Sequence, residues 1–304
     1  MSYPLTIVRL ASTFLLALGF PLHALAAPMT LKQYMALDGP SPTQTIPYGS
    51  APSQYAELFE PDGAGPFPVV VLVHGGCWQK EFGGIRQMHS MAGALRADGI
   101  AVWNVEYRRV DESGGGYPGT YQDINQALDT LAEQASAHHL DLQHLVAVGH
   151  SAGGQLVQWM GARARIASSS PVYDAKAYPI REVVSLGGLA DLRKLKSRIQ
   201  KVCEVEMPKL TGTPSAGRSD PYSDTDVAAL LPTGSHTVLI NGALDHQVPP
   251  SVARAFAARA RAAGDHVETQ VVPGASHFDE VTAGSPAWPS VLKAIRQALG
   301  RPVE

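Results

Sequence analysis

The stretch LVAVGHSAGG (residues 145–154) passes from a continuous apolar run into a turn of small residues around Ser151. The run at 145–148 is typical of a strand buried on both faces, and a helical pattern follows the turn. A serine flanked by Gly149 and Gly153 can expose its hydroxyl there, because small neighbours permit a sharp turn. The positive end of the helix dipole points at this serine, and the next amide can donate to an oxyanion. A chance match is the alternative interpretation, since glycine and serine are common in turns.

Strands and helices alternate along the rest of the chain. Apolar, β-branched runs predict strands, and apolar residues at helical spacing predict the helices between them. The predicted strands lie at 68–73, 100–107, 183–186, 237–240 and 267–272, a weak hairpin at 46–58, and helices at 86–97, 120–135, 252–263 and 291–299. This alternation predicts an α/β fold with a mostly parallel central sheet and helices on both faces. Residues 191–232 interrupt the alternation and predict a lid insertion.

The composition indicates a single folded domain over residues 27–304 of the 304-residue chain. With 45% hydrophobic and 17% charged residues, the chain is too apolar for a disordered protein. Its net charge of −3 lacks the basic excess that a nucleic-acid partner requires. Two cysteines are too few for a disulfide scaffold or a multi-cysteine metal site. These two, Cys77 and Cys203, either pair and hold the lid insertion or remain separate buried thiols.

Residues 1–26 have the pattern of a cleaved signal peptide. Arg9 is their only charged residue, and an apolar run ends in small residues, with cleavage expected after Ala26. An uncleaved membrane anchor is the alternative, but the run is about 16 residues long, whereas a bilayer needs about 20. We therefore expect a periplasmic or secreted protein that keeps no membrane anchor after cleavage.

The turn HGGCW (residues 74–78) follows another buried strand, so its backbone amides are expected at the same sheet edge as Ser151. A serine hydroxyl needs a base and an orienting acid to become a nucleophile. Asp245 and His277 each follow a predicted strand, and the chain order Ser, Asp, His is the order that this architecture requires. Asp279 is the runner-up acid. Trp78 is expected either to line the acyl pocket and bind substrate or simply to pack in the core.

Five motifs carry a resemblance to a known family: HGGCW at 74–78, EYRR at 106–109, GHSAGG at 149–154, GALDHQVP at 242–249 and GASH at 274–277. Over about residues 45–300 the chain resembles an α/β-hydrolase of the esterase/lipase group, and is most similar to bacterial kynurenine-formamidase-like and acyl-esterase-like members.

The resemblance implies a role for each residue of the site. Ser151 is then the nucleophile, His277 the base and Asp245 the acid, and the backbone amides of Gly76, Cys77 and Ala152 form the oxyanion hole. The hormone-sensitive-lipase-like subgroup has a third glycine where this chain has Cys77, which counts against that subgroup but leaves the amide in place.

The implied function is an exported serine hydrolase that cleaves small-molecule carboxylic esters of short to medium acyl chains through an acyl-enzyme. No cofactor is expected, and the histidines at 138, 139 and 144 lack the spacing of metal ligands. Arylformamidase activity, hydrolysis of an N-formylkynurenine-type amide by the same triad, is the alternative. A catalytically inactive binding module on the same fold is a third hypothesis, disfavoured by the complete set of serine, aspartate and histidine.

Overall fold

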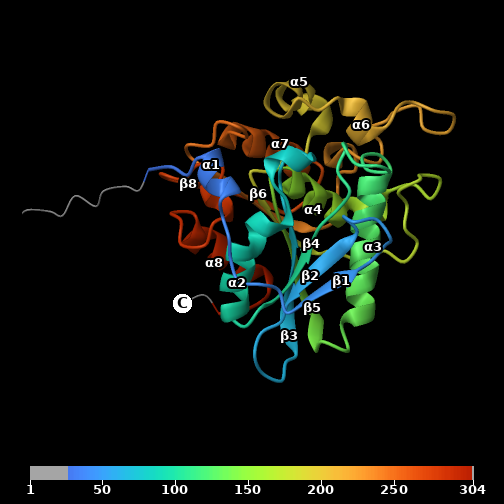
Figure 1. The fold of residues 1–304 in the computed structure, drawn as a ribbon. Helices are drawn as coiled ribbons and strands as arrows, with labels where there is room; N and C mark the ends of the chain where they lie inside the picture. Colours follow the sequence, from blue (N-terminus) through green and yellow to red (C-terminus); the bar gives the residue numbers. More distant parts are fainter. Residues whose placement is uncertain (1–26, 303–304) are drawn as a thin grey trace, which may run out of the picture.

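The computed structural model describes residues 27–302, which form an eight-stranded sheet covered by helices (Figure 1). The predicted signal peptide at 1–26 lies outside these residues. The strand order is β1-β2-β4-β3-β5-β6-β7-β8; β1 and β2 pair antiparallel with each other, as do β2 and β4, and all other pairs are parallel. The strands are β1 (Gln44–Pro47), β2 (Tyr55–Phe59), β3 (Phe67–Val73), β4 (Ala101–Val105), β5 (Leu140–His150), β6 (Glu182–Leu186), β7 (His236–Gly242) and β8 (Val267–Val272).

Helices cover both faces of the sheet, with α2 and α8 on one side and α3 on the other in Figure 1. The α-helices are α1 (Leu31–Met35), α2 (His89–Ala97), α3 (Gly119–Gln134), α4 (Ala152–Ala162), α5 (Leu192–Cys203), α6 (Met207–Thr211), α7 (Pro250–Ala262) and α8 (Trp288–Ala298). Short 3-10 turns are η1 (Lys80–Phe82), η2 (Ile85–Met88), η3 (Arg163–Arg165), η4 (Val227–Ala229) and η5 (Asp279–Val281). No helix within residues 27–302 is long and apolar enough to span a bilayer.

Strand β3 shows why its apolar run has no polar positions. Val69 and Val71 pack into the core on the side of α3, α4 and α7, whereas Val70 and Leu72 pack into the core beneath α2 and α8. All four side chains are fully buried. A strand covered on both faces needs an apolar side chain at every position, not at alternate ones. The predicted α/β fold with a mostly parallel sheet is therefore confirmed, including the antiparallel hairpin of β1 and β2.

Some element bounds differ from those predicted. β5 begins at Leu140, several residues before its apolar run, because its first part pairs with the start of β3 across a shift in register. The helix predicted from residue 86 opens with the 3-10 turn η2 and becomes α-helical only at His89. β8 has the predicted bounds.

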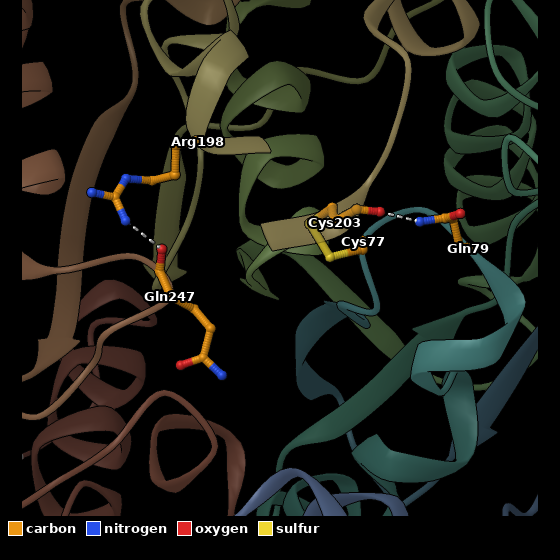
Figure 2. Close-up of a disulfide and its surroundings, with 5 residues drawn as sticks. All are labelled: Cys77, Gln79, Arg198, Cys203 and Gln247. Atoms are coloured by element: carbon orange, nitrogen blue, oxygen red, sulfur yellow. Dashed lines mark hydrogen bonds between the residues drawn. A yellow bond between two sulfur atoms is a disulfide. The ribbon is translucent and has the colours of Figure 1, made fainter. Parts of the chain in front are cut away.

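The predicted lid insertion, residues 191–232, contains α5, α6 and η4, and α5 lies at the top of the molecule in Figure 1. A disulfide joins Cys203, the last residue of α5, to Cys77 in the loop after β3, with Cα atoms 5.3 Å apart. The side-chain amide of Gln79 donates to the carbonyl oxygen of Cys203 at 2.5 Å (Figure 2). Of the two alternatives for the thiols, pairing is the one that the structure contains, and it fixes α5 to that loop.

Replacement of Cys203 by serine should destabilise the oxidised protein, because the disulfide connects residues 126 positions apart. Restriction of the unfolded chain by a loop of this length contributes about 4–5 kcal/mol in the chain-entropy model. Urea unfolding with and without a reductant measures the effect. The wild type should lose stability on reduction while Cys203→Ser does not respond. Equal midpoints for Cys203→Ser and the oxidised wild type would contradict this assignment.

Candidate active site

Ser151 occupies the sharp turn between β5 and α4, with φ 52° and ψ −113°. A Cβ on Gly153 would lie 2.2 Å from the carbonyl oxygen of Val73, and one on Gly149 would lie 2.3 Å from that of Gly153. The Ser151 amide donates to the carbonyl oxygen of Leu186 at 2.8 Å, which ties the turn to β6. Both glycines are thus required by close backbone contacts, which argues against a chance match of the motif.

His277 and Asp245 meet beside this turn. His277 Nδ1 lies 2.8 Å from Asp245 Oδ2, and the other oxygen of Asp245 accepts the Val248 amide at 2.7 Å. His277 lines the same cavity as Ser151, a space of about 110 Å³. When Nδ1 donates its hydrogen to Asp245, the lone pair of Nε2 is left to accept a proton. The structure thus places Ser151 at the same cavity as an imidazole that is hydrogen-bonded to Asp245.

Asp279, the runner-up acid, makes different contacts. Its Oδ2 accepts hydrogen bonds from the amide of Ser276 at 2.7 Å and from the Ser276 hydroxyl at 2.6 Å. The Met29 amide donates to the same oxygen at 3.2 Å. Asp279 therefore shapes the loop that carries His277 and holds the N-terminal arm, whereas Asp245 contacts the imidazole.

The predicted oxyanion amides are available. Gly76 and Cys77 line the cavity, with φ 96° and 53°. Within residues 27–302 no hydrogen bond uses the amide hydrogen of either residue. Ala152 begins α4, where the first amides have no partner within the helix. The loop passes close to the nucleophile, since a Cβ on Gly75 would lie 3.1 Å from the Ser151 Cβ.

Trp78 does not reach the cavity. It also has a left-handed backbone, with φ 54°, and its side chain is fully buried in the core on the side of α3 and α4. Its carbonyl oxygen accepts the Val110 amide at 2.9 Å. The expectation that Trp78 binds substrate is wrong, and the alternative, packing in the core, is what the structure shows.

His150 supports the loop that carries His277. Its Nε2 lies 3.0 Å from the carbonyl oxygen of His277, and it lines the cavity. Burial, and then the nearby His277, hold the pKa of the His150 imidazole well below its ordinary value. A neutral His150 donates to that carbonyl without adding a positive charge beside the base.

Glu280 is a residue of the site that the sequence analysis missed. It is buried, its Oε1 accepts the Gly242 amide at 2.6 Å, and its Oε2 lies 4.0 Å from His277 Nδ1. Burial, followed by the charge of Asp245, raises the pKa of Glu280 well above its ordinary value. Glu280 therefore holds its proton more tightly than an ordinary glutamic acid does. The sequence signal that could have indicated this residue is its spacing: Glu280 lies three residues after His277, which places the two side chains on the same face of a helical turn.

Within the described part of the chain, two groups of side chains have possible ligand atoms within 4.8 Å of one another: His150, His277 and Glu280, and His236, His266 and Glu268. In the first, His277 Nδ1 already binds Asp245. In the second, His236 Nδ1 binds Glu182 at 2.7 Å. In both groups a histidine nitrogen that could bind a metal ion is thus already hydrogen-bonded to a carboxylate of the protein.

Comparison with known proteins shows the same architecture. The BD-FAE family model matches residues 57–259, and no curated protein matches the sequence. Esterase B from Lactobacillus rhamnosis is 20% identical over 89% of this chain and 90% of its own, with a TM-score of 0.73. A truncated carbohydrate esterase from gut microbiota is 16% identical over 86% and 100%, with a TM-score of 0.64. Esterase 2 from Thermogutta terrifontis, phosphoramylated by tabun, is 18% identical over 84% and 93%, with a TM-score of 0.65. The predicted α/β-hydrolase fold is confirmed.

Asp245→Asn should lower kcat for p-nitrophenyl acetate by about 10⁴-fold, because the imidazole is then held in the wrong tautomer. Asp279→Asn should have a mild effect, since Asp279 contacts the loop and not the imidazole. Steady-state kinetics of the two variants, each checked for folding by circular dichroism, compares them. A larger loss in Asp279→Asn would show that the acid is wrongly assigned.

Glu280→Gln should become more stable relative to the wild type as pH rises. The folded protein holds the Glu280 proton more tightly than the unfolded chain, so wild-type stability falls as pH rises above 4.5 and through the raised pKa. Glutamine has no proton to lose, and the difference grows by up to about 1.4 kcal/mol per pH unit. Urea midpoints between pH 5 and 9 test this, with the exposed Glu133→Gln on α3 as the control. Parallel curves for Glu280→Gln and wild type would refute the neutral state of Glu280.

Proposed function

The chain belongs to the BD-FAE family, and on that premise we propose that it is a carboxylic ester hydrolase that works through an acyl-enzyme on Ser151. One observation carries the proposal: Ser151, on its strained turn, lines the same cavity as an imidazole bonded to Asp245. The esterases among its structural neighbours support the same reaction class.

The reaction follows from the positions of these groups. His277 takes the hydroxyl proton as Ser151 Oγ attacks the acyl carbon, and Asp245 stabilises the imidazolium that forms. The amides of the oxyanion hole, at Gly76, Cys77 and Ala152, donate to the negatively charged oxygen of the tetrahedral intermediate. The imidazolium then protonates the leaving alcohol. Water repeats the cycle on the acyl-enzyme and releases the acid.

The preferred substrates in this proposal are esters of short acyl chains. The cavity is small, and apolar side chains such as Leu189, Ile199 and Val248 make up much of its lining. Each methylene that fits such a lining contributes about 0.8 kcal/mol, and a chain that exceeds the space gains nothing further. The helix that closes the cavity, α5, carries charged side chains and offers little to a lipid surface.

We place the enzyme in the periplasm or outside the cell. The signal-peptide pattern at residues 1–26 supports export. The disulfide between Cys77 and Cys203 also supports an oxidising compartment, because disulfides are rare in the cytosol. Formamide hydrolysis uses the same tetrahedral intermediate, so the triad is compatible with it, but export favours esters over a cytoplasmic metabolite.

The kcat/KM for p-nitrophenyl esters should be highest between acetyl and butyryl and should fall at dodecanoyl, with N-formylkynurenine turned over more slowly than the best ester. A maximum at dodecanoyl, or formamide turnover above every ester, would overturn the substrate assignment.

Ser151→Ala should lower kcat by about 10⁴–10⁶-fold while its thermal unfolding stays unchanged, because only one hydroxyl is lost. Full activity in Ser151→Ala would overturn the assignment of Ser151 as the nucleophile.

A further inference from the structure

Arg198 places a permanent positive charge in the wall of the catalytic cavity. The side chain lies on α5, and among the described residues that line this cavity it is the only arginine or lysine. No aspartate or glutamate is part of the same lining. Among the described residues that line the cavity, none therefore carries a charge opposite to that of Arg198.

The guanidinium of Arg198 has few partners in the protein. It donates one hydrogen bond, to the carbonyl oxygen of Gln247 at 3.1 Å (Figure 2). Within the part of the chain from 27 to 302, no carboxylate lies within 4 Å of it, whereas Arg108 and Arg109 are paired with Asp123 and Glu106. A guanidinium has five N–H donors in a planar fork that fits a carboxylate. Most of these donors in Arg198 have no protein acceptor.

The rest of α5 has the same sign of charge. The helix carries five basic residues, Arg193, Lys194, Lys196, Arg198 and Lys201, and no acidic one. Among the described residues, the acidic groups at its start are Asp191, which caps its first turn and pairs with Arg259, and Asp226, which accepts the backbone amides of Leu192 and Arg193. Asp220 pairs with Arg193, and Glu204 and Glu206 follow the end of the helix. In a protein with a net charge of −3, a basic helix over the cavity attracts anions toward its mouth.

We propose that Arg198 binds a carboxylate of the substrate, so that the preferred esters carry an anionic group close to the ester bond. This rests on the proposed ester hydrolysis and adds the chemical class of substrate to it. The carboxylate can belong to the acyl part, as in a half-ester of a dicarboxylic acid, or to the alcohol part, as in an ester of a hydroxybenzoate or a uronic acid. The apolar lining strengthens the interaction, because a charge pair is screened less there than in water.

Two pairs of esters, whose members differ only in charge, test whether the carboxylate belongs to the alcohol part or to the acyl part of the substrate. On the alcohol side, 4-carboxyphenyl butyrate is compared with 4-carbamoylphenyl butyrate. On the acyl side, the 4-nitrophenyl half-ester of succinate is compared with the 4-nitrophenyl ester of succinamate. In at least one pair the wild type should have a KM about 10- to 100-fold lower for the anionic ester, the range expected for hydrogen bonds to a charged group.

Arg198→Gln should remove this preference, because glutamine has no charge to pair with the carboxylate, so kcat/KM should fall much more for the anionic ester than for the neutral ester of the same pair. Lys196→Gln is the matched control, since it removes the same charge from an exposed position on the same helix. It should keep the preference.

Three results would overturn the inference: no preference in either pair, an equal loss on both members of a pair in Arg198→Gln, or an equal effect of Lys196→Gln. An equal loss on both esters would mean that Arg198 only holds α5 to the loop at Gln247. Calorimetric titration of the Ser151→Ala protein with the same esters measures binding without turnover. If the wild type hydrolyses none of the four esters, the proposed function fails, and the titrations still decide whether Arg198 selects the carboxylate.

Discussion

The close contact between the start of α4 and the end of β3 is the constraint on which the site depends. Gly153 lies against the carbonyl oxygens of Val73 and His74 with no room for a side chain. This contact forces the left-handed backbone of Ser151, a conformation that costs of order 1–3 kcal/mol and persists only when its surroundings require it. It also brings the first amide of α4 next to the loop after β3. The proposed nucleophile and the proposed oxyanion donors thus come from a single packing arrangement of two elements.

The pKa values of two buried glutamates beside this arrangement are shifted in opposite directions. Burial opposes ionisation of Glu106, but His74 at 2.8 Å and Arg109 at 2.6 Å hold the pKa of its carboxyl below the ordinary value. For Glu280, burial and then the charge of Asp245 raise the pKa of the carboxyl. Glu106 therefore anchors the loop after β3 through its charge. The raised pKa of Glu280 favours its neutral form beside Asp245, the proposed acid.

The sequence predicts best those features that rest on local constraints. The strands at 68–73 and 267–272 are predicted because apolar and β-branched runs are strand patterns wherever they occur, and Ser151 is predicted because its turn needs glycines at fixed spacing. Asp245 and His277 are predicted from their places after strands, and the structure brings them together at 2.8 Å. The neutral state of Glu280 depends on a residue 35 positions away, so no local pattern contains it.

Features that depend on side-chain direction were not predictable in the same way. Trp78 follows the oxyanion loop in the sequence, yet its left-handed backbone turns it into the core. Arg198 is one of five basic residues on α5, and its sequence neighbours do not distinguish it from the exposed lysines. Only the position of α5 over the cavity distinguishes Arg198, which lines the cavity, from the basic residues of α5 that face solvent.

The disulfide connects the position of α5 over the cavity to the proposed oxyanion hole. Cys77, whose amide belongs to the proposed oxyanion hole, is also bonded to Cys203, which ends α5. Arg198 lies five residues before Cys203 on the same helix, an axial distance of about 7.5 Å at 1.5 Å per residue. The path from the oxyanion hole to the guanidinium thus consists of one covalent bridge and one rigid segment of helix. In the proposed mode of binding, the distance between a carboxylate held by Arg198 and a carbonyl held at Cys77 is limited by this path and by the length of the arginine side chain. A substrate is then selected by the length of the spacer between its two groups as well as by its charge.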